Sequence, residues 1–172
     1  MNYRISLAIL CLAYVLTGCA IKHPQTAAEF RNELPGATFG SKQSFEVKRS
    51  ITKVSKTFQK MAPQCLNKRV KSVTTGYMYH QVIVTDYNPK VIIGKNRTEL
   101  HLQQDHLQGV MNVSKKPKGG YYLMVVDAIA LGKNKTRIDM YVPTIGYDHV
   151  VEAIKGWATG NNVGCPDLAK NS

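Results

Sequence analysis

The stretch SFEVKRSITKVSKTFQKM, residues 44–61, decides the fold class because it joins a strand pattern to a helix pattern at one residue. Phe45 and Val47 alternate with polar residues, which predicts a strand with one buried side. Ser50 is a suitable helix N-cap. Beyond it, apolar residues recur at spacings of three and four, at Ile51, Val54, Phe58 and Met61. We therefore expect a strand followed directly by an amphipathic helix.

This helix is expected to end early. Pro63 lacks a backbone N–H and cannot continue a helix cleanly. Residues 63–66 are therefore predicted to form a separate turn that presents Cys65.

The long central part of the chain, from Val70 to Val142, has an alternating pattern of apolar and polar residues. Turn signals interrupt it about every ten residues, which is typical of consecutive antiparallel strands. The most apolar strand is expected at 121–131. The sequence predicts one antiparallel meander with turns at Asn88-Pro89, 94–96, Gln104-Asp105, 115–120 and 132–135.

Two more helices are expected, one on each side of this unit. Near the N-terminal end, Thr26 and Glu29 fit a capping box, and the helix they open would bury Ala27, Phe30 and Leu34. Near the C-terminal end, residues 147–158 carry apolar residues on one helical face, and Gly160 is a suitable C-cap.

The predicted order is β-α-β(5–7)-α, an α+β class in which a single antiparallel sheet packs on a C-terminal helix. This order resembles the helix-grip domains of the START and Bet v 1-like families over most of residues 44–158. The resemblance implies a cavity between the sheet and the last helix that takes a hydrophobic ligand. The last helix is about half the usual length, so a small packed core is the alternative. The candidate cavity residues are Val82, Val84, Met111, Met124, Met140 and Trp157.

The N-terminal segment has the anatomy of a signal peptide. Arg4 precedes an uncharged run, Ile5 to Leu16, that is shorter than the roughly 20 residues needed to cross a bilayer. The sequence Leu16-Thr17-Gly18-Cys19 resembles the lipobox of bacterial lipoproteins. That resemblance implies cleavage before Cys19, a diacylglyceryl thioether on its sulfur and an acyl chain, such as palmitate, on its amino group. An ordinary secretory signal is the alternative.

The resemblance to lipoproteins also implies a location. Ala20, and not the aspartate that marks inner-membrane retention, follows the cysteine, which favours the outer membrane with the domain facing the periplasm. We therefore divide the chain into a signal peptide (1–18), a lipidated tether with a short helix (19–43) and a periplasmic domain (44–172).

The charge of the mature chain is strongly positive, with 22 basic and 11 acidic residues after residues 1–18 are removed. Such a balance favours an anionic partner, such as phospholipid headgroups, lipopolysaccharide phosphates or an acidic protein. The alternative is charge spread over the surface for solubility. The expected compartment and the lack of an aromatic and basic RNA-binding signature argue against nucleic acid.

Two cysteines remain for structural use once Cys11 leaves with the signal and Cys19 is acylated. Because exported chains fold in an oxidising compartment, we expect Cys65 and Cys165 to form a disulfide.

The chain offers little that indicates chemistry. His101, Asp105 and His106 form the one local cluster that suggests a metal, and no cysteine completes a site there. No nucleophile elbow of the form G-x-S-x-G is present. Asp127 lies within the most apolar strand, where we expect it to face an edge or solvent, because a buried carboxylate would need partners or a raised pKa. We expect no enzyme activity, metal or cofactor.

The tyrosines are a further candidate surface. Tyr77, Tyr79 and Tyr87 share one strand face, and Tyr121 and Tyr122 begin the most apolar strand. They form either a binding surface or ordinary packing, and packing is the preferred interpretation.

Two functions follow from these patterns. The first is a lipid-anchored protein whose non-catalytic periplasmic domain binds another envelope component, either a protein or an anionic molecule. The alternative is a carrier of a lipid or other hydrophobic ligand in a helix-grip cavity.

Overall fold

The computed structural model describes residues 23–75, 80–108 and 115–169. Cys19, Tyr77, Tyr79 and Met111 lie outside these ranges. The elements are α2 (Ala27–Glu33), the 3-10 helix η1 (Leu34–Gly36), β1 (Gly40–Val47), α3 (Ile51–Leu66), β2 (Lys68–Thr75), β3 (His80–Ile93), β4 (Arg97–Gln108), β5 (Tyr121–Gly132), β6 (Lys135–Pro143) and α4 (Asp148–Thr159). The predicted α+β class is confirmed.

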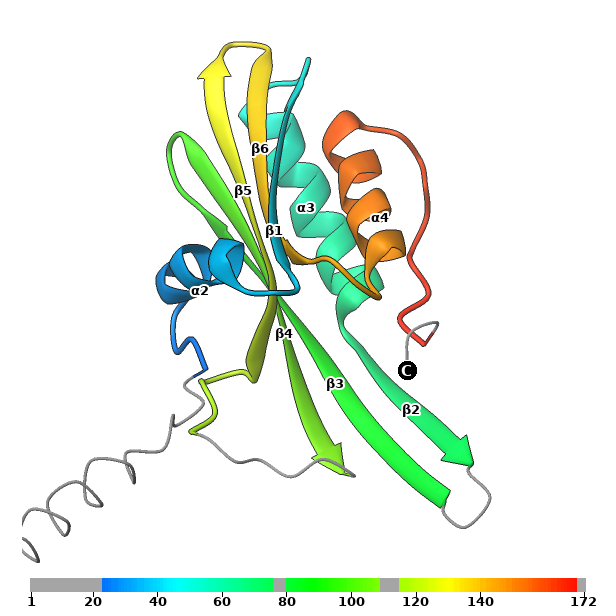
Figure 1. Cartoon of the computed structure of the whole chain (residues 1–172). Coiled ribbons are helices and arrows are strands. Elements are labelled where there is room, and N and C mark those ends of the chain that lie inside the picture. The colour runs from blue at the N-terminus through cyan, green and yellow to red at the C-terminus, as the bar shows by residue number, and fades with distance from the viewer. Residues whose placement is uncertain (1–22, 76–79, 109–114, 170–172) are drawn as a thin grey trace, which may run out of the picture.

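The six strands form one antiparallel sheet in the order β1-β6-β5-β4-β3-β2. Strands β2 to β6 are a meander, and β1 returns to pair with β6. In Figure 1, α3 and α4 lie on one face of this sheet and α2 lies on the other.

The main core lies between the sheet and α3. Buried α3 residues such as Val54 and Phe58 share one apolar cluster with Met124 and Met140 of the sheet. Burial of each such large side chain contributes about 1.5–3 kcal/mol. Helix α3 packs against β3, β4, β5 and β6, while α4 packs beside α3. Buried α4 residues such as Ile154 and Trp157 belong to the same cluster, so α3 covers this face of the sheet together with the predicted C-terminal helix.

Helix α3 runs through Pro63 to Leu66, so the predicted break at Pro63 is wrong. Because Pro63 has no backbone N–H, the carbonyl of Gln59 lacks its helical hydrogen-bond donor. Both residues are exposed, so water can donate to that carbonyl instead. Cys65 and Leu66 beyond the proline are buried in the core, and their burial favours the last turn of the helix.

The predicted turn at Asn88-Pro89 is also wrong, because β3 continues through both residues. Strand β2 pairs with β3 only as far as Tyr87, whereas Pro89 pairs with Leu102 of β4. Pro89 therefore lies in the part of β3 that pairs with β4 and, among the described strands, has no partner on its other side. A missing N–H on that unpaired side costs no ladder hydrogen bond.

The predicted hairpin at Gln104-Asp105 is likewise wrong, because both residues lie within β4. Gln104 pairs with Tyr87 and Tyr121, and Asp105 pairs with Asp86. The long neighbouring strand β3 supplies partners over this whole stretch, so the chain remains extended.

Helix α4 ends as its sequence predicts. Gly160 has a φ of +90° and donates to the carbonyls of Gly156 and Trp157, as in a left-handed C-cap. Arg49, from the connection between β1 and α3, donates to the carbonyls of Trp157 and Ala158. The two helices are thereby linked at one end.

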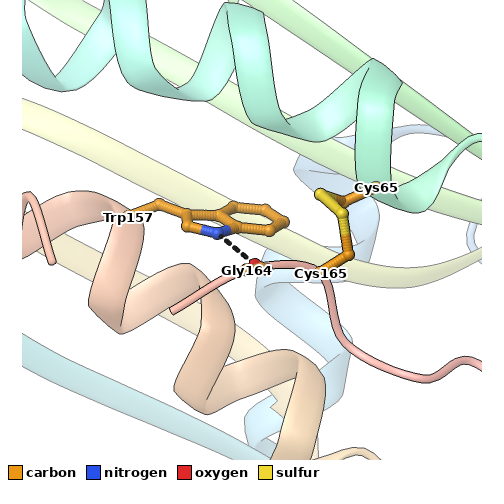
Figure 2. The surroundings of a disulfide bond; sticks show 4 residues. All are labelled: Cys65, Trp157, Gly164 and Cys165. Atoms are coloured by element: carbon orange, nitrogen blue, oxygen red, sulfur yellow. Dashed lines mark hydrogen bonds between the residues drawn. A yellow bond between two sulfur atoms is a disulfide. The ribbon is translucent and has the colours of Figure 1, made fainter. Parts of the chain in front are cut away.

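The predicted disulfide between Cys65 and Cys165 is present. It joins the last turn of α3 to the segment that follows α4, across a sequence separation of 100 residues (Figure 2). The indole of Trp157 lies beside it and donates from Nε1 to the carbonyl of Gly164 at 3.1 Å. The polar tail is therefore attached to the helical layer at two adjacent points.

Helix α2 forms where expected, and Thr26 accepts a hydrogen bond from the backbone of Glu29. Its buried residues Ala27 and Phe30 contact Val125 of β5. The short helix of the segment predicted as a lipidated tether (19–43) therefore packs on the sheet. Among the described helices, none combines the length and the apolar character that a membrane span requires.

Candidate functional site

The sheet face that carries α2 is polar, and the strand register places three of its carboxylates in one row. Glu99 of β4 is opposite Asp127 of β5, which is opposite Asp139 of β6. Like charges directly opposite each other destabilise a sheet unless they are compensated. This row therefore needs cations close by.

Three arginines supply that compensation. Arg31 of α2 donates to both carboxylate oxygens of Asp127, at 2.7 and 2.9 Å, and also bonds Glu99. Arg97 reaches Asp127 at 2.9 Å, and Arg137 reaches Asp139 at 3.2 Å. The expectation that Asp127 faces an edge or solvent is wrong, since it is 3% exposed. It has the partners that a buried carboxylate requires.

His101 lies at the end of this network. Its side chain is buried, and Nε2 donates to Glu99 at 2.8 Å. Burial lowers the pKa of His101 below its ordinary value, although Glu99 acts in the opposite direction. Burial by itself would raise the pKa of Glu99, but hydrogen bonds from Arg31 and His101 hold it below the usual range. The imidazole is therefore neutral and the carboxylate ionised at neutral pH.

A groove of about 630 Å³ opens on the same face, beside α2. We call it the Lys90–Lys118 groove. Register places Asn88 opposite Gln103 and Lys90 opposite His101, so these four side chains share one face. The lining residues are Gln25, Ala27, Asn88, Pro89, Lys90, His101, Gln103, Lys118, Gly119 and Tyr122.

One wall of the groove is a tight turn before β5, in which Gly120 donates to the carbonyl of Pro117. Gln103 is buried and donates from Nε2 to the carbonyls of Lys118 and Gly120, at 3.0 and 2.8 Å. Asn88 donates to the carbonyl of Gly119 at 3.1 Å. Three consecutive carbonyls of the turn are thus bound to side chains from two strands.

The groove carries positive charge. None of its described lining residues is acidic. Within the described ranges, the lysines that form ion pairs are Lys116, Lys135 and Lys155, so Lys90 and Lys118 have no carboxylate partner there. An anion entering the groove would meet two ammonium groups that make no competing ion pair.

Of the six residues proposed for a helix-grip cavity, Met111 lies outside the described residues, and the other five do not surround one space. Met124, Met140 and Trp157 are buried together in the core beneath α3 and α4. Val82 and Val84 alternate along β3 with buried Tyr87, so they lie on the opposite face of the sheet. Trp157 also borders a second groove, of about 340 Å³, beside Arg49.

The remaining candidates are separated as well. His106 lies 3.0 Å from Thr85 through Nδ1, whereas His101 bonds Glu99, so the two imidazoles have different partners. Tyr87 is buried in the core, while Tyr122 lines the groove. The sequence reasoning missed the groove and the carboxylate row, because both depend on the register between neighbouring strands, which the alternation within each strand does not determine.

Comparison with known proteins does not identify a family. No family model matches the chain, and no curated protein matches it. A solved structure of norcoclaurine synthase from Thalictrum flavum, in complex with dopamine and hydroxybenzaldehyde, is similar over 67% of this chain and 75% of that chain, with 15% sequence identity and a TM-score of 0.28. A likeness at this TM-score carries no argument about function.

Proposed function

We propose that this protein is a lipoprotein of the outer membrane whose periplasm-facing domain binds another component of the cell envelope without catalysing a reaction. The observation that supports it is the course of the chain at the Lys90–Lys118 groove. Gln25 lines the groove and donates to the carbonyl of Lys115 on its rim, at 2.9 Å. The lipobox cysteine, Cys19, lies six residues earlier. Six residues span at most about 22 Å, so the groove would open close to the anchoring membrane.

A binding role fits the distribution of charge better than a catalytic one. Arg31 and Arg97 neutralise Glu99 and Asp127 in a network that ties α2 to the sheet. These groups are occupied by one another, whereas the groove lysines are available to a partner. Two acyl chains on Cys19 would suffice for stable attachment to a membrane.

The anchor is tested by substitution of the lipobox cysteine. In cells of a bacterium that processes lipoproteins, Cys19→Ser should move the protein out of the outer-membrane fraction or leave its signal peptide uncleaved. Cys11→Ala, which changes a cysteine of the same apolar segment outside the lipobox, is the control and should remain attached and processed. A Cys19→Ser variant that still fractionates with the outer membrane in processed form would contradict the proposed anchor.

The binding role is tested by photo-crosslinking in intact cells. A crosslinking amino acid at exposed Lys115, on the rim of the groove, should give a defined adduct with a component of the envelope. The same amino acid at Lys48, an exposed residue outside the groove, is the matched control. Equal adducts at both positions, or none at Lys115, would contradict binding at this groove.

A further inference from the structure

We propose that the Lys90–Lys118 groove binds the phosphate-bearing headgroup of an anionic phospholipid in the membrane to which the protein is anchored. The inference rests on the proposed attachment through Cys19 and names the ligand of the proposed binding site.

The electrostatics around the groove favour an anion. Asp105, the acidic residue nearest in sequence to the lining residue Gln103, is held by Lys116 at 2.8 Å. Glu99 is bound by Arg31, Arg97 and His101. Glu29 lies beside the lining residue Gln25 and accepts a hydrogen bond from its backbone N–H at 2.8 Å. Among the lining residues themselves, the charged side chains are those of Lys90 and Lys118. A lysine near an anionic membrane surface contributes about 1 kcal/mol to binding.

The groove is also preorganised for such a ligand. The bonds from Gln103 and Asn88 hold the turn that carries Lys118. Lys90 is held on the other side of the groove by its pairing with β4. Since a ligand does not have to order this backbone, less binding free energy is lost on association.

The rest of the lining suits the part of a phospholipid next to its phosphate. Ala27, Pro89 and Tyr122 add apolar surface to the polar residues. The volume of about 630 Å³ lies within the range of small-molecule sites. A phosphate between the two lysines would place its glycerol group against this apolar surface.

Position favours a lipid over a free phosphate compound. The lining residue Gln25 lies six residues after the proposed acylation site, and that stretch spans at most about 22 Å. Attachment through Cys19 would hold the groove at the headgroup layer, where the local concentration of phospholipid phosphate is high.

The test uses the lipidated mature protein, purified in a neutral detergent and titrated by calorimetry. The probes are dihexanoyl phosphatidylglycerol, dihexanoyl phosphatidylcholine and glycerol phosphate. We expect phosphatidylglycerol to bind more tightly than the other two. At about fivefold for each lysine, Lys90→Gln with Lys118→Gln should weaken its binding about 25-fold. Lys48→Gln with Lys53→Gln, which removes the same charge from exposed positions outside the groove, should leave it within about twofold.

Three results would overturn the inference. Equal weakening by both double variants would mean that net charge, and not the groove, attracts the lipid. Glycerol phosphate that binds as tightly as phosphatidylglycerol would assign the site to a free phosphate compound. No saturable binding of phosphatidylglycerol would exclude the headgroup as ligand. A protein adduct at Lys115 together with this last result would support the proposed function while the present inference fails.

Discussion

Arg31 and Asp127 form a two-point ion pair between α2 and β5, at 2.7 and 2.9 Å, although 96 residues separate them in the chain. Both side chains are largely buried, with exposed fractions of 15% and 4%. The pair joins the helix that follows the proposed anchor to the centre of the sheet. It therefore determines how that end of the domain is held.

Loss of this pair should destabilise the protein. Asp127→Asn removes the buried negative charge that Arg31 and Arg97 share, while Glu99 still binds both arginines. Breaking a buried pair costs about 3 kcal/mol. A double-mutant cycle with Arg31→Met, followed by chemical denaturation, should give a coupling energy above about 1 kcal/mol. The exposed pair of Arg69 and Asp86 is the matched control and should couple much more weakly, because solvent screens it. Equal coupling in both cycles would contradict a special role for Arg31.

The turn before β5 should not tolerate a side chain at Gly120. This residue has a φ of +103°, and an added Cβ would lie 2.4 Å from the carbonyl oxygen of Gln104. Gly120→Ala should lower the free energy of unfolding by about 2–3 kcal/mol. Gly36→Ala, at a glycine with open space around its Cβ position, should change it by less than about 0.5 kcal/mol. Similar values for the two variants in urea denaturation would show that the turn adapts.

Removal of the disulfide should destabilise the domain. Cys65→Ser with Cys165→Ser opens a closed loop of about 100 residues, which the chain-entropy model values at about 4–5 kcal/mol. Addition of a reductant should lower the denaturation midpoint of the natural protein and leave that of the double variant unchanged. Thiol labelling before reduction should modify neither cysteine. Labelling of Cys65 or Cys165 without reductant would contradict the bond.

Stability should fall as the pH drops below the ordinary histidine pKa of 6.5. Burial lowers the pKa of His101 and of His106 in the folded state, so the unfolded chain binds protons more readily in this range. The free energy of unfolding therefore decreases from about pH 7 towards the folded-state pKa values. Denaturation at pH 7.5 and 5.5 measures the decrease, and His101→Gln with His106→Gln should reduce it. An unchanged difference in that variant would assign it to other groups.

A separate decrease is expected at lower pH. The pKa of Glu99 is lowered in the folded state, so its contribution to stability is present above its ordinary value of 4.5 and is lost as the pH falls through the folded-state pKa. Glu99→Gln should remove this contribution and flatten the stability curve below pH 4.5. Retention of the full slope in Glu99→Gln would show that another carboxylate is responsible.

Local patterns determined much of the fold. The strand that contains Phe45, the Ser50 cap and the helix after it occur where the alternation changes to a spacing of three and four. The Thr26 cap, the Gly160 cap and the disulfide also follow from the sequence. These features could be predicted because each depends on neighbouring residues or, for the disulfide, on the two cysteines that remain.

Tertiary structure decided the features that depend on contacts between different helices and strands. Pro63 is tolerated in α3 because burial of Cys65 and Leu66 favours the last turn of the helix. Pro89 is tolerated in β3 because β2 does not extend alongside it. Glu99 and Asp127 face each other, and Lys90 and His101 line one groove, only because of the strand register. Periodicity in the sequence indicates which residues share a face of one strand, but not which residues of another strand lie opposite them. The carboxylate row and the Lys90–Lys118 groove are therefore properties of the assembled sheet.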